Sequence, residues 1–335
     1  MSVARRIAFA LLLACCSIAR PAHAATAAAT AGPARPAAPA CRAGAAKLVA
    51  PLRAALAGAR FVTYQPTALR FWDGRPTRAD AASIEADLVA LRPWFDALVT
   101  YDAINGVEQL PAIAARLGFR ALLVGVWDPF DEAQVAAALA AARAHPRLVV
   151  GLSLGNEMVF GKRRGAAELA ARIAELHRRA PGLALSTTEP FHIWLEPRSR
   201  PLLEQMDFVL ANVHPVFEPW FRAAPDANGA RFVVDVVALL GAAHCGPVLV
   251  KETGVPTAPA DRGYTPARQR SFYEALARAL PPTREHAFAW FAAFDAAWRE
   301  FDWHPVPGPH PEEAHWGLFY EDRRPKQVLQ SLPRR

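Results

Sequence analysis

Two glutamates follow apolar runs of strand length, and their type and spacing could support acid–base chemistry. Glu157 follows the run 148–154, and Glu252 follows the run 248–251. Two carboxyl groups over one cleft can cleave a glycosidic bond, because one protonates the departing oxygen while the other attacks the sugar or activates water. One group must be protonated and the other ionised at the same pH, which different surroundings can enforce. The pair therefore indicates glycosidic chemistry, with a surface acid or a helix cap as the alternative for each glutamate.

The first run also carries a competing motif. Residues 151–155 read G-L-S-L-G and fit G-x-S-x-G, the turn that presents a nucleophilic serine in α/β-hydrolases. Ser153 would need an acid and then a histidine later in the chain, and Asp235 with His304 or His310 gives an allowed order. No His-Gly-Gly-Gly segment precedes the serine, and both of its neighbours are bulky leucines. A serine esterase is therefore the weaker alternative.

Eight apolar runs of strand length recur after residue 60. They are 61–64, 97–101, 121–126, 148–154, 183–186, 208–213, 248–251 and 287–291. Most are continuous rather than alternating, as expected for parallel strands covered on both faces, and they begin about 32 residues apart, the length of one strand–helix unit. Leu169, Ile173 and Leu176 illustrate the helical spacing of apolar residues between the runs. These features predict an α/β fold, a (β/α)8 TIM barrel with one extra N-terminal helix at about 42–56, and a doubly wound open sheet is the alternative.

A barrel would bring the two glutamates together, because its active site forms where the strands end. Glu157 and Glu252 are 95 residues apart, about three strand–helix units, so both should lie over one rim. Alternation along the strand expected at 148–154 directs Glu157 and Ser153 into the barrel and turns Val150 toward the helices. The same alternation turns Lys251 outward, where its ammonium group must either reach solvent or follow a β-bulge.

Five short motifs occur in order along the chain: L-S-L-G-N-E, A-N-V-H-P-V-F, K-E-T-G-V-P-T, W-F-A-A-F-D-A-A-W and H-W-G-L-F. Together they resemble glycoside hydrolase family 17, the β-1,3-glucanase and glucanosyltransferase family, particularly its bacterial members, over about 61–326. The resemblance implies a retaining double displacement with Glu157 as acid/base and Glu252 as the nucleophile. The two carboxyl groups of such a pair should lie roughly 5 Å apart. It also implies that Asn156 hydrogen-bonds the sugar hydroxyl next to the reacting carbon.

The sequence departs from the family pattern at four positions. Val99 replaces an arginine common in the family, Ala292 replaces a frequent glutamate, Val255 replaces the usual tryptophan, and His214 stands where many plant relatives have tyrosine. The two glutamates are intact. The resemblance therefore implies hydrolysis or transglycosylation of β-glucan, with β-1,3-linked glucan as the expected substrate, and leaves open a catalytically inactive carbohydrate-binding barrel.

Aromatic residues in or near the loops after the strands predict a sugar cleft. The chain has nine tryptophans, and aromatic rings suit the C–H faces of pyranose rings. The candidate substrate-contacting side chains are Tyr64, Tyr101, Trp127, Trp194, Trp220, Trp290 and Phe291, and Trp298 and Trp303 lie in similar loops. Of Trp290 and Phe291, one is expected in the core and the other on the floor of the cleft. His214 could hydrogen-bond Glu252 and hold it ionised.

The N-terminus predicts export. Residues 1–24 combine two arginines at positions 5 and 6, an apolar run too short for a membrane span and an Ala-His-Ala cleavage site, which is typical of a signal peptide. Cys15 also sits in a loose lipidation motif, so a lipoprotein anchor is an alternative. Residues 25–40 form an Ala/Pro-rich linker, and 41–335 form a single glycosidase domain. The protein is therefore expected in the periplasm or outside the cell, without a membrane span.

Charge and cysteine content limit the kinds of partner and cofactor that the chain is expected to bind. Removing residues 1–24 lowers the net charge from +7 to +4, and no basic stripe for nucleic acid is present. Cys41 and Cys245 remain, and they either form a disulfide or stay free thiols. No Cys/His cluster has metal-ligand spacing, so neither a metal nor another cofactor is expected. We expect a monomer that acts on a β-glucan polysaccharide or oligosaccharide.

Overall fold

The computed structural model describes residues 38–335 except 73–74, 302–303 and 305. Residues Pro39–Arg335 form one compact unit. The predicted signal peptide at 1–24, the lipidation motif and most of the linker at 25–40 lie outside the described residues.

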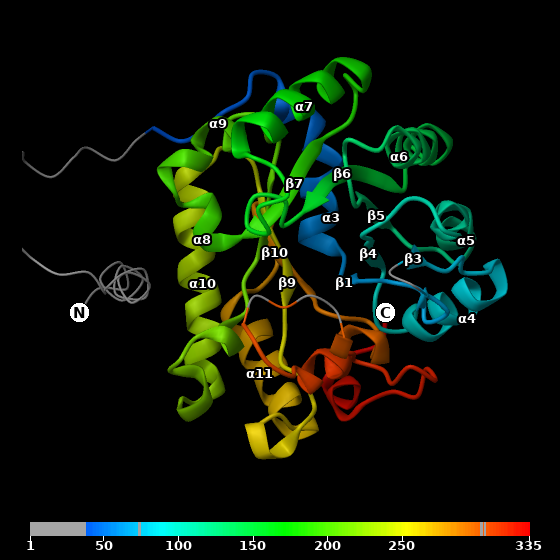
Figure 1. Cartoon of the computed structure of the whole chain (residues 1–335), viewed down its shortest axis with the longest axis vertical. Coiled ribbons are helices and arrows are strands. Elements are labelled where there is room, and N and C mark those ends of the chain that lie inside the picture. The colour runs from blue at the N-terminus through cyan, green and yellow to red at the C-terminus, as the bar shows by residue number, and fades with distance from the viewer. Residues whose placement is uncertain (1–37, 73–74, 302–303, 305) are drawn as a thin grey trace, which may run out of the picture. The chain divides into compact units, whose positions relative to one another are not determined.

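Eight parallel strands close into a barrel (Figure 1), in the order β1-β10-β9-β8-β7-β6-β5-β4. The strands are β1 (Phe61–Thr63), β4 (Ala97–Val99), β5 (Ala121–Val126), β6 (Val149–Asn156), β7 (Leu185–Pro190), β8 (Val209–Asn212), β9 (Val248–Thr253) and β10 (His286–Trp290). Each of the eight apolar runs contains part of one strand. The predicted (β/α)8 barrel is confirmed, and the open-sheet alternative is wrong. A short antiparallel hairpin of β2 (Phe71–Trp72) and β3 (Arg75–Pro76) lies outside the barrel sheet and was not predicted.

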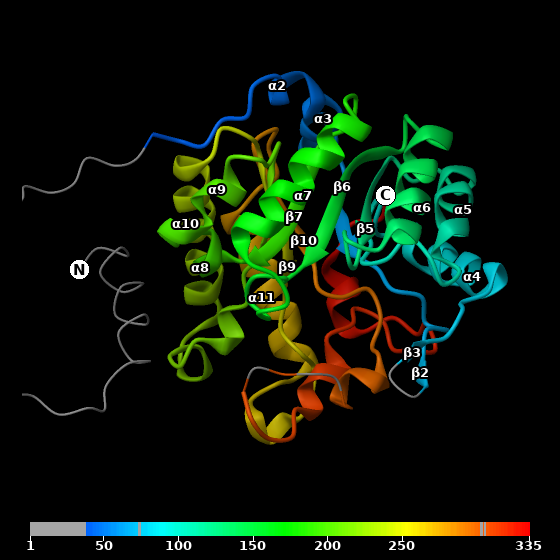
Figure 2. The ribbon, with the colours of Figure 1, turned by 45° about the horizontal axis from the view of Figure 1, so that its top comes forward.

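Helices surround the barrel, as Figures 1 and 2 show. They are α4 (Ala81–Leu91), α5 (Leu110–Arg116), α6 (Glu132–Ala144), α7 (Ala166–Arg179), α8 (Phe191–Trp194), α9 (Arg200–Leu203), α10 (Asp226–Ala243) and α11 (Pro266–Ala279). Several begin where the side chain of a cap residue accepts a backbone N–H bond. Asp131 caps α6 in this way, and Thr265 caps α11 with Pro266 following in the first turn.

Short 3₁₀ helices complete the connections, and after β10 they take the place of an α-helix. They are η1 (Val107–Gln109), η2 (Pro197–Ser199), η3 (Pro215–Phe217), η4 (Phe221–Ala223), η5 (Ala260–Arg262), η6 (Ala297–Phe301), η7 (Pro311–His315) and η8 (Gln327–Ser331). The segment between η6 and η7 includes the undescribed residues 302–303 and 305.

The predicted extra helix at 42–56 is divided into α2 (Ala45–Leu48) and α3 (Ala50–Gly58). Pro51 lies in the first turn of α3, where its missing N–H costs no helical hydrogen bond, so a new helix begins there. Leu52 and Leu56 of α3 are fully buried in the cluster that fills the barrel interior. The extra helix therefore closes the N-terminal end of the barrel.

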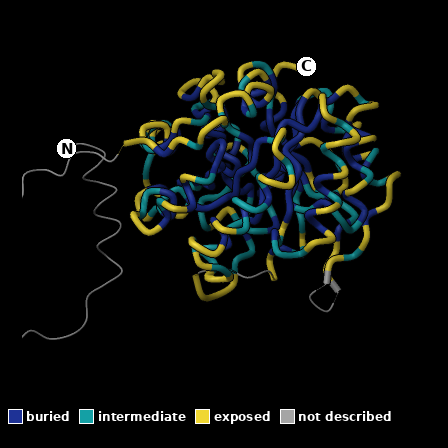
Figure 3. The backbone as a smooth tube through the Cα atoms, turned by 90° about the horizontal axis from the view of Figure 1, so that it is seen from above, coloured by how far each residue is buried: buried dark blue, intermediate teal, exposed yellow. Residues whose placement is uncertain are grey.

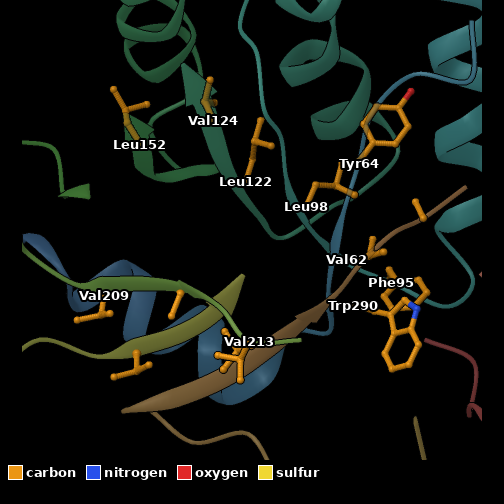
Figure 4. Close-up of a cluster of buried hydrophobic side chains, with 14 of the residues drawn as sticks. Val62, Tyr64, Phe95, Leu98, Leu122, Val124, Leu152, Val209, Val213 and Trp290 are labelled. Carbon is orange, nitrogen blue, oxygen red and sulfur yellow. The ribbon is translucent and has the colours of Figure 1, made fainter. Parts of the chain in front are cut away.

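Two layers of apolar side chains form the core, and the buried residues concentrate in the middle of Figure 3. The inner cluster contains residues near the strand starts, such as Phe61, Phe208 and Leu249. The outer cluster lies between strands and helices and includes Val62 and Leu152, which Figure 4 shows. Neighbours on one strand thus alternate between the two layers, as expected of a barrel.

One side chain departs from the predicted alternation. Val150 belongs to the inner cluster rather than to the helix-facing layer. The pairing of β5 with β6 shifts register here, because Leu122 pairs with Val149 and Leu123 with Gly151. The extra residue changes the direction of Val150, so its predicted orientation is wrong.

The N-terminal end of the barrel is also held by a covalent bond. Cys41 and Cys245 form a disulfide with a Cα–Cα distance of 5.2 Å, across 204 residues of sequence. Ala40 pairs with His244 beside it, and Arg42 forms an ion pair with buried Asp207. Closing so long a loop is worth on the order of 5 kcal/mol in a chain-entropy model.

Within the described part of the chain, none of the helices combines the length and the apolar character that a bilayer crossing needs.

Candidate active site

A sharp turn at the end of β6 carries Glu157 onto the rim of the barrel. Gly155 has φ 93° and Glu157 has φ 53°, so both adopt left-handed backbone conformations. A Cβ at Gly155 would lie 2.7 Å from the Met158 side chain, which leaves room only for glycine. The Glu157 N–H donates to the Thr188 carbonyl at 2.8 Å and fixes the turn. A strained non-glycine residue of this kind is frequent at functional sites.

Glu157 lies in surroundings that favour its protonated form. Burial raises the pKa of Glu157, and the negative charge of Glu252 raises it further. The amide Nδ2 of Asn212, at the end of β8, donates to Glu157 Oε1 at 2.8 Å, which offsets part of this rise in pKa. Glu157 can therefore hold a proton at a pH where an ordinary glutamate has lost it.

Glu252, on β9, lies in surroundings that favour its ionised form. Burial alone would raise the pKa of Glu252, but the hydrogen bond from His214 and the charge of Lys251 outweigh it and lower the pKa. His214 Nε2 lies 3.5 Å from Glu252 Oε2, which is the predicted contact between these residues. The other oxygen, Oε1, accepts no hydrogen bond from the described residues. Glu252 is thus held in its carboxylate form by His214 and Lys251.

A β-bulge turns Lys251 into the barrel beside Glu252. Ala211 of β8 pairs with Val250, and Asn212 pairs with Glu252, so Lys251 is the extra residue on β9. A bulge allows neighbouring side chains to point to the same side of a sheet. Lys251 is 1% exposed, and its Nζ donates to Asn156 Oδ1 at 2.7 Å. Of the two predicted positions for Lys251, the structure therefore shows the bulge.

A third carboxyl group supports the turn at Glu157 and was missed in the sequence. Glu189, at the end of β7, is fully buried and accepts the backbone N–H groups of Val159 and Phe160 at 2.8 and 3.1 Å. Burial raises the pKa of Glu189 to about 7. The predicted fifth strand stopped at residue 186, and the structure extends it to Pro190. With the strand placed correctly, Glu189 would have stood out as another acid at a strand end.

Aromatic rings pack around His214 on the Glu252 side of the site. The ring of His214 lies 5.5 Å from Phe291 and 5.1 Å from Trp316, and these two rings are 5.3 Å apart. Phe217 is 53% exposed, and its ring lies 5.4 Å from His214. Phe291 is only partly buried, as expected for the floor of a cleft. Sequence reasoning missed Trp316 and Phe217, although both fall in motifs that carry the family resemblance.

Other rings extend the candidate cleft. Trp127, after β5, is 43% exposed, and the Arg163 guanidinium lies 4.9 Å from its ring. The guanidinium of Arg299 lies 4.6 Å from the Phe291 ring, and Arg299 also donates to Gln65. The Trp298 ring lies 4.6 Å from Phe71 on the hairpin. Trp303 lies outside the described residues.

Three predicted substrate contacts belong to the core instead. Tyr64 is 1% exposed and its hydroxyl donates to Asp87 on α4, so it faces the helix layer, as Figure 4 shows. Trp194 is 2% exposed and donates to the Leu210 carbonyl. Trp290 is fully buried against Phe272 and Tyr273 of α11. The expectation that Tyr64, Trp194 and Trp290 contact substrate is therefore wrong, because buried rings on the helix side of the strands cannot reach the cleft.

Two further candidates occupy intermediate positions. Tyr101 is 7% exposed, and its ring lies 4.2 Å from Lys251 Nζ, so it lies beneath the carboxyl pair. Trp220 is 37% exposed and packs on Phe221 and on Phe232 of α10. A contact between Trp220 and sugar remains a prediction.

The serine motif does not form a nucleophile. Ser153 is 2% exposed inside β6, and its hydroxyl hydrogen-bonds Thr188 at 2.9 Å. Asp235 pairs with Arg231 on α10, whereas His304 stacks on His310 at 3.5 Å. These contacts contradict an esterase triad.

The described part of the chain offers no cluster of side chains for a metal ion. Across 38–335, leaving out the five undescribed positions, no group of three or more His, Cys, Asp or Glu side chains could hold a metal ion.

Comparison with known proteins relates both the sequence and the fold to carbohydrate-active enzymes. Residues 62–317 match the BtgE/BtgC glycoside hydrolase domain. A glucan 1,3-beta-glucosidase from Arthroderma benhamiae is 27% identical over 263 residues, which cover 74% of this chain and 84% of that protein.

Solved structures share the barrel. A glycoside hydrolase family 17 beta-1,3-glucanosyltransferase from Rhizomucor miehei has a TM-score of 0.64 at 21% identity and covers 80% of this chain and 95% of its own. An active-site mutant of the R. miehei beta-1,3-glucanosyltransferase, in complex with laminaritriose, has the same TM-score at 20% identity, covering 80% and 96%. CJP38, a beta-1,3-glucanase and allergen of Cryptomeria japonica pollen, has a TM-score of 0.58 at 15% identity, covering 80% and 97%.

Proposed function

Because the chain belongs to the BtgE/BtgC glycoside hydrolase domain family, we propose that it cleaves or transfers β-1,3-linked glucan with Glu157 as acid/base and Glu252 as nucleophile. One observation carries this assignment. The carboxyl groups of partly buried Glu157, at the end of β6, and buried Glu252, on β9, have pKa values shifted in opposite directions, upward for Glu157 and downward for Glu252. A retaining glycosidase needs this division between an acid and an ionised nucleophile.

The first step uses both carboxyl groups. A carboxylate oxygen of Glu252 attacks the reacting sugar carbon, and the bond from that carbon to the leaving oxygen breaks. Glu157 gives its proton to the leaving oxygen, so the departing sugar leaves with a neutral hydroxyl group. The products of this step are a glycosyl ester on Glu252 and an ionised Glu157.

The second step reverses these roles. Once Glu252 is an ester it no longer carries a negative charge, so one cause of the raised pKa of Glu157 is gone. Glu157 then removes a proton from water or from a sugar hydroxyl, whose oxygen attacks the ester-bearing sugar carbon. The bond from that carbon to Glu252 breaks, which returns Glu252 to a carboxylate and leaves Glu157 protonated. Attack by water gives hydrolysis, and attack by a sugar gives a longer glucan.

Asn156 is placed to bind the reacting sugar. Its side-chain oxygen is occupied by Lys251, so its Nδ2 group is the part left to donate to a substrate oxygen. We assign this donor to the hydroxyl next to the reacting carbon. Phe217 and Trp127 are exposed rings that would stack on sugars farther along the cleft.

The relatives support the choice of substrate. A curated relative is named as a glucan 1,3-beta-glucosidase, and a solved relative binds laminaritriose. We therefore assign a β-1,3-glucan polysaccharide or oligosaccharide as substrate, acted on by a monomer in the periplasm or outside the cell.

The direct test is turnover of laminarin and laminari-oligosaccharides by E157Q, E252Q and S153A. We expect both glutamine variants to lose activity by at least about 10²-fold, since a general acid or a nucleophile contributes at least that much. S153A should stay active, because Ser153 is a buried strand residue. Sizing the products over time distinguishes transfer from hydrolysis. Unchanged turnover in both glutamine variants would refute the proposal, and binding of laminari-oligosaccharide without turnover by the wild type would identify an inactive sugar-binding barrel.

A further inference from the structure

The most unusual group beside the two carboxyls is the ammonium group of Lys251. It is 1% exposed, at the bulge of β9, and cannot reach solvent as surface lysines do. Its Nζ lies 2.7 Å from Asn156 Oδ1, 3.6 Å from Glu252 Oε1 and 4.2 Å from the centre of the Tyr101 ring. A buried cation is costly unless the groups around it compensate its charge.

We propose that Lys251 is a positioning residue of this site, which fixes the orientation of the Asn156 amide and supplies the positive charge beside Glu252. The proposal rests on the function assigned above. Lys251 is closed off from the cleft, so it acts on the reaction through these two neighbours rather than by touching the sugar.

The effect on Asn156 follows from the donors and acceptors of the two side chains. A lysine ammonium only donates, so the Asn156 amide must turn its oxygen toward Lys251. Its NH₂ group then points away from Lys251 and remains for substrate. Without Lys251, both orientations of the amide would be available, and one of them would present an oxygen where a donor is needed.

The effect on Glu252 is electrostatic. Glu252 Oε1 accepts no hydrogen bond within the described chain, and the charge of Lys251 at 3.6 Å stabilises it as a carboxylate. That charge helps to keep Glu252 in the ionised form that a nucleophile needs. The titratable and charged groups that face Lys251 are Glu157 after β6, Glu189 on β7, Tyr101 after β4 and Glu252 on β9, and His214 faces Glu252 from the end of β8.

The experiment compares K251M and K251Q with the wild type and with a matched control. K251M removes the charge and the hydrogen bond, whereas K251Q keeps an amide donor for Asn156. K326M is the control, because Lys326 is also a buried lysine, 3% exposed, but it binds Thr257 and Asp295 rather than the carboxyl pair. The readouts are the pH dependence of kcat/KM on laminari-oligosaccharides and the rate at which a 2-deoxy-2-fluoro laminaribioside labels Glu252.

K251M should move the acid limb of the pH profile upward by roughly 1–3 pH units, the range typical of losing an adjacent opposite charge. Labelling of Glu252 should slow by roughly 10-fold at a pH on that limb, because less of the nucleophile is ionised. The reagent carries fluorine in place of the hydroxyl assigned to Asn156, so kcat on laminari-oligosaccharides reports the effect of the Asn156 orientation. K251Q should show a similar shift of the acid limb with a smaller loss of kcat, and K326M should leave the limb in place.

Three other outcomes would contradict either the proposal or the assigned nucleophile. A folded K251M with an unmoved acid limb and labelling within twofold of the wild type would overturn the proposal. Failure of both K251M and K251Q to fold, while K326M folds, would also overturn it, because Lys251 would then be a structural residue. If the wild type turns over its substrate but is labelled elsewhere than Glu252, the assigned nucleophile is wrong, which is a separate failure.

Discussion

The ends of β6 and β9 carry the same side chain in opposite electrostatic surroundings. At the end of β6, Glu157 is partly buried near the negative charge of Glu252, and a neutral amide of Asn212 is its hydrogen-bond donor. At the end of β9, Glu252 has His214 on one oxygen and the cation of Lys251 near the other. The strands also differ in backbone, with a left-handed turn at Glu157 and a bulge at Lys251. The surroundings, rather than the residue type, therefore favour the proposed assignment of Glu157 as the acid and Glu252 as the nucleophile.

The largest expected effect is a loss of kcat/KM that depends on the substrate for Glu157 but not for Glu252. E252Q should lose roughly 10⁴-fold or more in kcat/KM on every substrate, because no glycosyl ester can form. E157Q should lose a similar factor on laminari-oligosaccharides but much less on an aryl β-glucoside, whose leaving group needs no proton. The measurement is kcat/KM for both variants on both substrates. Equal losses by E157Q on the two substrates would show that the comparison between the strand ends is wrong.

Glu189, which supports the turn at the end of β6, should contribute to the pH dependence of stability. Its pKa of about 7 in the folded protein lies above the ordinary value of 4.5, so the folded state holds a proton that the unfolded state has lost between these pH values. The free energy of unfolding should therefore fall as pH rises from about 4.5 to about 7, by about 3 kcal/mol for this group. E189Q cannot ionise and should lack this part of the pH dependence.

Urea unfolding at several pH values measures this contribution. E168Q is the matched control, because Glu168 is an exposed acid on α7 and should leave the pH dependence as in the wild type. A pH dependence of stability that is the same in E189Q and the wild type would show that Glu189 is not the group that titrates.

Removal of the hydrogen-bond donors of Glu157 and Glu252 should move opposite limbs of the profile of kcat/KM against pH. Asn212 lowers the pKa of Glu157, so N212A should raise it further and extend activity to higher pH on the basic limb. His214 lowers the pKa of Glu252, so H214F should raise that pKa and move the acid limb upward. Each shift should change kcat/KM by about tenfold on the steep part of its limb, because a hydrogen bond to a charged group is worth roughly 1.5–3 kcal/mol.

The control for His214 is H214Q, whose amide keeps a donor near Glu252 and should retain more of the acid limb than H214F. The profile of kcat/KM against pH distinguishes these cases. If N212A and H214F moved the same limb, the separate assignment of the two carboxyl groups could not hold.

The sequence predicts the barrel that holds this site better than the directions of the side chains within it. Continuous apolar runs at regular spacing predicted the barrel, and the barrel placed Glu157 and Glu252 on one rim. Val150 was misplaced by strict alternation, and alternation left Lys251 open between solvent and a bulge, because bulges depend on pairing with a neighbouring strand that the sequence of one strand does not reveal. Tyr64 and Trp194 were misassigned for a related reason. A ring at a strand end can face either layer, and only packing decides which.

The aromatic rings give the smallest expected effect and extend the comparison beyond the carboxyl groups. Trp127 contacts Arg163 of the loop after β6, whereas Phe217 contacts His214, the partner of Glu252. If sugars stack on these rings on opposite sides of the scissile bond, W127A and F217A should each raise KM for laminari-oligosaccharides several-fold, since a ring contact is worth roughly 0.5–1.5 kcal/mol. Only the variant on the acceptor side should lower the ratio of transfer to hydrolysis, because water needs no aromatic platform. Product sizing for W127A, F217A and the exposed control V89A measures that ratio, and equal ratios in all three would show that neither ring binds the acceptor sugar.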